Sequence, residues 1–378
     1  MKIAYILSTL TNKGGVERII IDKANALAER QGIEVYIVCA AGHDNDVPGF
    51  NVDSRVHIVN FDLVFNPGYS VMIRPVSFCF NWFLWRRELK KRIRAFVKEH
   101  NIDITVSLTY DIALPYHMGG CPHILESHCS KNETINLSLI PMTRLIQTRT
   151  ATRQSDVVVA LTSKDLKFWN KAKKAVCISN FTSVKQYAPY NSDIKSIVAA
   201  GRLEEQKGFD ILIKAWHIIN RRHPDWNLDI YGEGSLRTRL QHDIEKQNLE
   251  SSVRLCGASD NIAKTFSHYS IFALSSRFEG FGLVLLEAMT CGVPCVSFDC
   301  PEGPSEIITD GRDGILVPFR GLSDSQRAEV LAENICRMIE NRDMRLRMSE
   351  KAIAKAATFS RDVIIDRWIE LFNDITKK

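Results

Sequence analysis

Two segments of the chain place glycines and charged side chains where a strand would give way to a helix. The first, residues 276–289, reads Ser-Arg-Phe-Glu-Gly-Phe-Gly-Leu-Val-Leu-Leu-Glu-Ala-Met. Gly280 and Gly282 would let a ligand approach the backbone closely, and free amides at the start of the helix would bind an anion. We expect Glu287, five residues into that helix, to accept hydrogen bonds from a ribose diol, and Glu279 from sugar hydroxyls. A plain glycine-rich turn with a helix-favouring Glu is the alternative.

The second segment, residues 200–209, reads Ala-Gly-Arg-Leu-Glu-Glu-Gln-Lys-Gly-Phe and also joins a strand to a helix. Arg202 offers a planar fork for phosphate oxygens, and Lys207 offers a compact point charge. Two cations in front of a helix N-terminus suit a diphosphate. The alternative is that both cations simply pair with Glu204 and Glu205 at the surface.

Strands and helices must position these segments, and the hydrophobic pattern indicates both. Apolar runs alternate with amphipathic stretches, which favours parallel sheets covered by helices on both faces. In the first half of the chain we predict helices at 16–31 and 89–99, and strands at 2–7, 34–40, 56–61, 104–108, 123–126 and 157–161.

The pattern restarts after the polar stretch 186–195, which we interpret as a domain boundary. The fold class is therefore α/β, with two doubly wound parallel-sheet domains at residues 1–186 and 195–360. The last predicted helix, 362–376, is expected to pack back on the first domain. Ligands of such sheets bind outside the carboxyl ends of the strands, so we expect the chemistry in a cleft between the domains. The predicted strands of the second half are 196–200, 226–231, 253–256, 271–274, 295–298 and 315–317, and its helices are 209–222, 236–247, 328–341 and 344–358.

Together, the two segments resemble the signature of a known enzyme family. Gly-Arg-Leu-x-x-x-Lys-Gly, followed later by Glu-Gly-Phe-Gly-Leu-x-x-x-Glu, is similar to the motifs of the retaining glycosyltransferases of family 4 (glycosyl transferases group 1). These enzymes have the GT-B fold of two Rossmann-like domains. The resemblance covers essentially the whole chain, including Gly-Gly-Val-Glu at 14–17 and Tyr-Gly-Glu-Gly at 231–234. The segment 299–306 is also similar to that of bacterial surface-polysaccharide transferases.

The resemblance implies a role for each matching residue. Arg202 and Lys207 would neutralise the donor diphosphate, Glu287 would hold the nucleotide ribose, and Glu279 would position the donor sugar. His128 matches the family's active-site histidine and would orient the sugar or polarise a hydroxyl group. The other implied binding residues are Gly14 and Gly15 in a loop facing the phosphates, Gly232 and Gly234 at the nucleotide pocket, and Phe281, Gly282 and Leu283 beside the donor sugar.

One segment departs from the family pattern. The usual Pro-Asn-Gly after a strand appears here as Ser179-Asn180-Phe181, which weakens any role for Asn180. No Asp-x-Asp motif indicates a metal site, because Asp44-Asn45-Asp46 is poorly placed for one. We therefore expect no metal and no cofactor. Departure of the diphosphate would be assisted by cations and helix-end amides, with retention through same-face attack and no covalent carboxylate intermediate.

The acceptor is less defined by the residues. Residues 76–85 are apolar and aromatic, and cations follow directly, a combination that suits an anionic membrane surface. The alternative is a core-facing helix with one solvated side. No apolar run reaches the length of a membrane span or of a secretory signal, so we expect a cytoplasmic protein, at most at the inner face of the membrane. The cations are Arg86, Arg87, Lys90, Lys91, Arg92, Arg94 and Lys98.

The expected substrates are thus a sugar nucleotide, with a uridine diphosphate sugar as the default, and a glycan or polyprenyl-linked glycan acceptor in lipopolysaccharide or capsule synthesis. A sugar-nucleotide epimerase of the same fold, a glycoside phosphorylase and a non-catalytic sugar-nucleotide-binding protein are the alternatives. A nucleic-acid binder is disfavoured, although the net charge is +5, because the basic residues concentrate in one helix rather than in a known nucleic-acid-reading fold.

Overall fold

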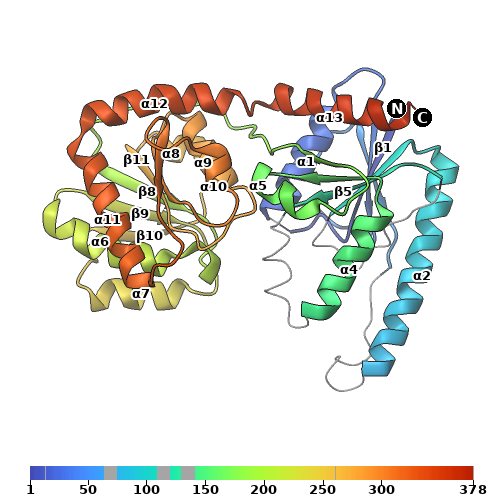
Figure 1. Cartoon of the computed structure of the whole chain (residues 1–378), viewed down its shortest axis with the longest axis horizontal. Coiled ribbons are helices and arrows are strands. Elements are labelled where there is room, and N and C mark those ends of the chain that lie inside the picture. Colours follow the sequence, from blue (N-terminus) through green and yellow to red (C-terminus); the bar gives the residue numbers. More distant parts are fainter. Residues whose placement is uncertain (13, 64–74, 109–119, 129–140, 260, 378) are drawn as a thin grey trace. The chain divides into compact units, whose positions relative to one another are not determined.

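The computed structural model describes residues 1–12, 14–63, 75–108, 120–128, 141–259 and 261–377. The chain forms two compact units, coloured along the sequence in Figure 1. The first unit comprises Met1–Ser179 together with Arg361–Lys378, and the second comprises Asn180–Ser360. Each unit is built on one parallel sheet, which confirms the predicted fold class of two doubly wound α/β domains.

The first unit has a seven-stranded sheet in the order β3-β2-β1-β4-β5-β6-β7, and every paired strand is parallel. Its five inner strands are almost wholly buried because helices cover both faces of the sheet, whereas the two edge strands are partly exposed. The strands are β1 (Lys2–Leu7), β2 (Glu34–Cys39), β3 (Val56–Asn60), β4 (Ile104–Leu108), β5 (His123–Ser127), β6 (Val157–Ala160) and β7 (Ala175–Cys177). The helices are α1 (Gly15–Ala28), α2 (Pro75–His100), α4 (Pro141–Gln154), α5 (Ser163–Leu166), the 3-10 helix η1 (Lys167–Trp169) and α13 (Arg361–Thr376).

Helix α2 is longer than the sequence predicted. It has 26 residues and begins at Pro75, whereas the pattern predicted a helix only from residue 89, where polar residues first alternate with apolar ones. Its second half packs Leu89, Ile93, Phe96 and Val97 on one face of the sheet. This spacing is that of a helical apolar stripe, so the basic residues between them face away from the core.

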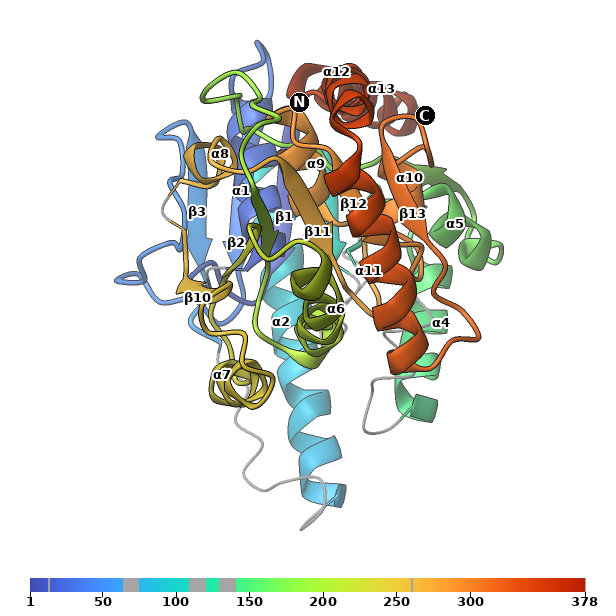
Figure 2. The same ribbon diagram turned by 90° about the vertical axis from the view of Figure 1, so that its left-hand side faces the viewer.

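The second unit has a six-stranded sheet in the order β10-β9-β8-β11-β12-β13. Helices α6 and α11 lie side by side over one face of it (Figure 2). Trp216 of α6 is fully buried in the core and donates a hydrogen bond to Ser252 at 3.1 Å. The strands are β8 (Ser196–Ala200), β9 (Asn227–Tyr231), β10 (Val253–Gly257), β11 (Ile271–Leu274), β12 (Cys295–Phe298) and β13 (Gly314–Val317). The helices are η2 (Glu205–Lys207), α6 (Phe209–Arg222), α7 (Arg237–Lys246), α8 (Ile262–Phe266), α9 (Leu283–Thr290), α10 (Pro304–Ile307), α11 (Asp324–Glu340) and α12 (Arg342–Ala357).

The segment after Ser179 belongs to the second unit, earlier in the chain than the boundary predicted at 186–195. Three hydrogen bonds explain the difference. Gln186 donates to the Cys291 carbonyl at 3.2 Å, Tyr190 donates to the Ser270 carbonyl at 2.8 Å, and the buried Arg345 donates to the Ser192 carbonyl at 2.8 Å. A polar segment thus satisfies its hydrogen bonds on the unit and does not act as a solvated linker.

The last helix returns to the first unit. On α13, Trp368 lies fully buried over Lys23 of α1, while Arg30, which follows α1, pairs with Asp362 and Asp366 at 3.0 Å and 3.1 Å. The first unit is therefore assembled from both ends of the chain.

Candidate functional site

The predicted donor-binding residues of the second unit gather at the carboxyl edge of its sheet. Strands β8, β11 and β12 are neighbours, and the loops that follow them carry Arg202 and Lys207, Glu279, and the segment 299–306. The carboxyl edge is where open α/β sheets bind ligands. The two segments identified from the sequence are therefore adjacent in space.

The loops after β8 and β11 are joined through their backbones. The Arg277 amide donates to the Gln206 carbonyl at 2.8 Å, the Gln206 side chain donates to the Phe278 carbonyl at 3.1 Å, and Ser275 Oγ donates to the Lys207 carbonyl at 2.9 Å. Gly208, with φ +61°, lies so close that a Cβ atom there would be 2.2 Å from the Ser275 carbonyl oxygen. Only glycine fits this position without a shift of the backbone.

Lys207 and Glu279 meet across this junction. The Lys207 ammonium lies 2.6 Å from Glu279 Oε1, and Ser276 Oγ donates to the same oxygen at 2.6 Å. Their side chains are 15% and 6% exposed. The surface pairing considered from the sequence is wrong, because Glu204 accepts hydrogen bonds from Ser235 and Glu205 pairs with Arg239. The partly buried Lys207 ammonium and the buried Glu279 carboxylate therefore form an ion pair at the sheet edge.

Arg202 is exposed, and its guanidinium lies 3.5 Å from the Gln206 side chain. Hydrogen bonds from Ser235, together with the charge of Arg202, lower the pKa of Glu204. Arg277, which the sequence analysis did not single out, is the opposite case. It pairs with Asp210 at 2.8 Å and with Asp324 at 2.8 Å, and the hydrogen bonds that it donates to Asp210 raise its pKa. Its position two residues before Glu279 in the sequence could have marked Arg277 as part of the site. Arg277 ties η2 and α6 to the Glu279 loop, while Arg202 keeps its charge available.

Gly232 and Gly234 have a structural reason for being glycine. A Cβ atom at Gly232, where φ is +147°, would lie 1.9 Å from the Gly201 carbonyl oxygen, and one at Gly234 would lie 2.5 Å from the Leu203 carbonyl oxygen. The backbones on either side are hydrogen-bonded, with the Gly201 amide donating to Tyr231 and the Leu203 amide to Glu233, both at 2.9 Å. These glycines therefore support the Arg202 loop directly.

Helix α9 begins after Gly282, which has φ +91° and serves as its N-cap. Leu283 opens the helix, and Glu287, its fifth residue, is 4% exposed. Phe281 is buried and packs edge-on against Phe359, with ring centroids 5.9 Å apart. The eight-residue helix thus places a buried carboxylate one turn inside an amide-rich N-terminus.

Neighbouring this helix, the loop after β12 is held by the Glu279 amide, which donates to the Pro301 carbonyl at 3.1 Å. Glu302 in that loop is buried and has φ +89°. Non-glycine residues rarely adopt this backbone conformation, and those that do cluster at functional sites. The sequence showed this segment only through its likeness to polysaccharide transferases.

The remaining predicted site residues belong to the first unit. Gly14 is the N-cap of α1, and the Glu17 carboxylate folds back so that a Cβ atom on Gly14 would lie 2.4 Å from it. Gly15 faces open space. His128 follows β5, and its Nε2 atom lies 3.2 Å from Glu126 Oε1. All three residues lie at the carboxyl edge of the first sheet, but the His128 side chain is only 1% exposed.

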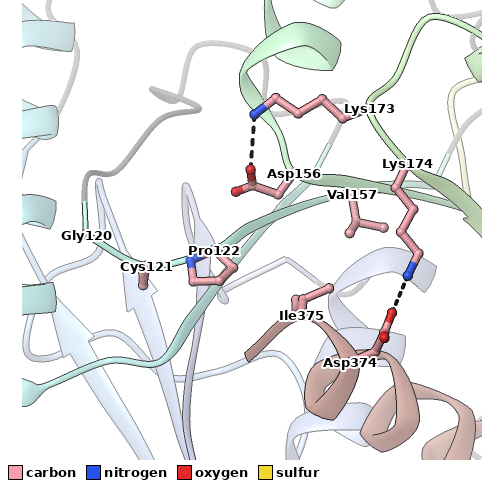
Figure 3. A pocket seen from close by; sticks show the side chains of 9 residues that line it. All are labelled: Gly120, Cys121, Pro122, Asp156, Val157, Lys173, Lys174, Asp374 and Ile375. Atoms are coloured by element: carbon pink, nitrogen blue, oxygen red, sulfur yellow. Dashed lines mark hydrogen bonds and ion pairs between the residues drawn. The ribbon is translucent and has the colours of Figure 1, made fainter. Parts of the chain in front are cut away.

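A pocket of about 590 Å³ lies at the opposite, amino edge of the first sheet (Figure 3). Its charged side chains already pair with one another, Lys173 with Asp156 at 3.1 Å and Lys174 with Asp374. Every charged side chain among the described lining residues therefore has a partner, and the sequence motifs lie elsewhere.

The structure was also searched for metal-binding groups and for membrane-spanning helices. Among the described residues, no group of three His, Cys, Asp or Glu side chains is arranged to hold a metal ion. Asp46 accepts a hydrogen bond from the His43 amide at 2.9 Å and so closes a turn. In the same part of the chain, no helix is both long enough and apolar enough to cross a membrane.

Comparison with known proteins places this site in context. Residues 182–355 match the family described as glycosyl transferases group 1. The chain is 28% identical to an uncharacterized glycosyltransferase of Haemophilus influenzae, over 97% of this chain and 98% of that protein. It is 30% identical to the amylovoran biosynthesis glycosyltransferase AmsD of Erwinia amylovora, over 47% of this chain and only 48% of AmsD.

A solved structure resembles the whole fold. TarM of S. aureus, crystallised with UDP among its ligands, superposes with a TM-score of 0.77 over 98% of this chain and 99% of that chain, at 15% identity. At this identity the likeness establishes the fold alone.

The contact of Gly232 with Gly201 gives a direct prediction. Gly232→Ala should displace the Arg202 loop and lower the free energy of unfolding by about 1–3 kcal/mol beyond the backbone strain, because the added methyl group overpacks the contact. Gly311→Ala is the matched control, since Gly311 also has positive φ but a Cβ atom there meets nothing within 4 Å. It should lose only the backbone term of about 1–2 kcal/mol. Urea unfolding of both variants measures the difference, and equal losses of stability would contradict the prediction.

Proposed function

We propose that the chain is a glycosyl transferase of group 1 that moves a sugar from a uridine diphosphate sugar to a glycan or lipid-linked glycan acceptor, with retention of the anomeric configuration. Residues 182–355 match that family, and the whole chain has the GT-B fold. The observation that supports this most is the Lys207–Glu279 pair at the carboxyl edge of the second sheet, with Arg202 exposed on the adjoining loop. One cation is free for phosphate oxygens, and a carboxylate is held for sugar hydroxyls.

The chemistry proposed for the site is electrostatic. Negative charge develops on the diphosphate as the bond between its terminal phosphate oxygen and the anomeric carbon of the donor sugar breaks. Fixed cations and amides stabilise this charge without reorganising. Arg202 and Lys207 supply the cations, and the start of α9 supplies the amides. Glu279, held by Lys207 and Ser276, would accept hydrogen bonds from the sugar, while Glu287 would accept them from the ribose. We propose that no metal ion takes part.

Two considerations support a role in surface polysaccharide synthesis. AmsD is named for amylovoran biosynthesis, and the segment with Glu302 is similar to that of polysaccharide transferases. An epimerase or a non-catalytic binding protein would share the donor site, and each would bind UDP without transferring sugar to a glycan. Transfer of a radiolabelled sugar to an extracted lipid-linked glycan separates these functions.

The proposed roles of the two cations can be tested by substitution. Arg202→Ala and Lys207→Ala should each lower the turnover number about 10²–10³-fold in assays containing chelator, the size of effect seen when one charge-stabilising group is lost. Lys207→Ala should also lower the thermal stability, because it leaves the buried Glu279 without its cation. Arg239→Ala, an exposed Arg that pairs with Glu205 beside the same 3-10 helix, is the control and should transfer normally. Near-normal turnover in both test variants would show that the clamp lies elsewhere.

Substitution of Glu287 and substitution of Glu279 should impair different steps. Glu287→Gln should weaken the binding of free UDP, because the ribose loses a charged acceptor. Glu279→Gln should leave UDP binding intact, since it releases Lys207 from its carboxylate partner, but it should reduce sugar transfer. Calorimetric titration with UDP and initial rates of transfer measure the two effects. Equal losses of UDP binding in both variants would remove the division between ribose and sugar.

We further propose that α2 attaches the enzyme to an anionic membrane surface. Phe83 and Leu84 on this helix are 59% and 44% exposed, and Arg86 stacks on Trp82 at 4.6 Å. Burial lowers the pKa of Lys90, and repulsion from the neighbouring cations Arg94 and Arg86 adds to that shift. Trp85 is part of the core instead, since it donates to the Leu63 carbonyl at 2.9 Å.

Replacing Arg87, Lys90 and Lys91 with Gln should therefore reduce binding to phosphatidylserine vesicles, since each basic residue near an anionic surface contributes about 1 kcal/mol. The same change at Arg347, Lys351 and Lys355 of α12 is the control. Co-sedimentation at low and high salt measures the effect, because salt screens the attraction. Wild-type protein that stays in the supernatant at low salt would exclude this attachment and favour a soluble acceptor.

A further inference from the structure

Three ionisable side chains from distant parts of the first unit are buried together. Lys23 of α1 and Glu126 of β5 form an ion pair, and their side chains are 1% and 0% exposed. The same carboxylate oxygen, Glu126 Oε1, lies 3.2 Å from Nε2 of His128. Leu125 packs in the cluster beneath α4, so by strand alternation Glu126 faces the opposite side of the sheet, where α1 lies.

Aromatic side chains enclose the pair. The Lys23 ammonium lies 4.2 Å from the centre of the Trp368 ring on α13 and 5.9 Å from that of Tyr5 on β1. Burial alone would raise the pKa of Glu126, but attraction to Lys23 and His128 outweighs it and holds that pKa at about 2. Burial in turn lowers the pKa of Lys23. Glu126 is therefore a carboxylate at neutral pH.

Stability alone does not account for this arrangement. A buried ion pair contributes little net stability compared with apolar side chains of the same volume. Within the described residues, Tyr5 Oη and Glu126 Oε2 have no hydrogen-bond partner, and unsatisfied buried polar atoms destabilise a fold. An apolar pair in place of Lys23 and Glu126 could not provide the contact that Glu126 makes with His128.

The orientation of His128 follows from this contact. A carboxylate only accepts hydrogen bonds, so its approach to Nε2 favours the imidazole form that carries its proton on that nitrogen. The ring is not aligned for a full hydrogen bond, so the interaction is mainly electrostatic. Lys23 sets where the carboxylate lies, and the carboxylate in turn faces the ring.

We propose that Lys23 and Glu126 are positioning residues that fix the orientation and the protonated nitrogen of His128, with Trp368 closing the pair from the last helix. The inference deepens the proposed function, because it assumes that His128 acts on the donor or acceptor sugar. Lys23 and Glu126 themselves touch no substrate. Because they act through His128 alone, their effect on turnover should disappear when His128 is absent.

The first experiment separates positioning from stability. The double variant K23M/E126L replaces the pair with apolar side chains, so it should fold with near wild-type thermal stability and bind UDP as wild type does. Its turnover number should nevertheless fall about 10²-fold, the effect of a small misplacement of a reacting group. K174M/D374L, which removes an exposed Lys–Asp pair of the same unit, is the control and should transfer normally. Wild-type turnover in K23M/E126L would overturn the proposal.

A double-mutant cycle then asks whether the pair acts through His128. In the H128A background, adding K23M/E126L should cause no further loss of turnover beyond about twofold, because residues that act as a unit are not additive. A full additional loss would overturn the proposal, since the pair would then act independently of the imidazole.

A second readout does not need activity. The nitrogen chemical shifts of the His128 imidazole, assigned by their absence in H128Q, should show a proton held on Nε2 in the wild-type protein. E126Q keeps the shape of the side chain but replaces the carboxylate with an amide that can either donate or accept, so it should give mixed imidazole forms. Identical signals in wild type and E126Q would overturn the proposal. If the wild-type protein transfers no sugar, the proposed function fails while this measurement still decides the positioning of His128.

Discussion

The backbone contact between the loops after β8 and β11 is the constraint on which the donor site depends. Gly208 brings Lys207 within reach of the Glu279 loop because it has no Cβ atom to collide with Ser275. Hydrogen bonds from Arg277 and Ser275 then hold the two loops at that distance. The ion pair between Lys207 and Glu279 is a consequence of this junction, since neither side chain comes from a rigid strand or helix interior.

The two units use buried charge in different ways. In the second unit, Lys207 and Glu279 retain some exposure, so a substrate can exchange contacts with either of them. In the first unit, Lys23 and Glu126 are enclosed by Trp368 and Tyr5, so no substrate reaches them. The first arrangement suits direct binding, and the second suits the orientation of a neighbouring group.

The fold and much of the donor site could be predicted from the sequence for identifiable reasons. Strands buried on both faces read as continuous apolar runs, as at 104–108 and 295–298. Paired charges in glycine-rich turns marked Arg202 and Glu279, whose loops the structure does bring together. The roles assigned to these residues stay predictions.

Other features depended on contacts between residues distant in the chain. The sequence could not show that Gly232 is a glycine because of Gly201, nor that segment 180–195 packs on the second unit. The sequence analysis did not identify the Lys23–Glu126 pair, although one feature of the sequence indicated it. Lys23 falls on the apolar stripe of α1 with Ile19, Ile20 and Leu27, where an uncompensated charge is unfavourable, but its partner lies in another element.

The return of α13 to the first unit also bears on the order in which the protein matures on the ribosome. Domains generally begin to fold from the N-terminus during synthesis, yet Trp368, which covers Lys23, is translated only after the whole second unit. The sheet of the first unit can form early, but its charged interior stays open to water until the second unit has been made. Completion of the first unit is therefore tied to translation of the second, and a product terminated before Trp368 would retain a hydrated Lys23.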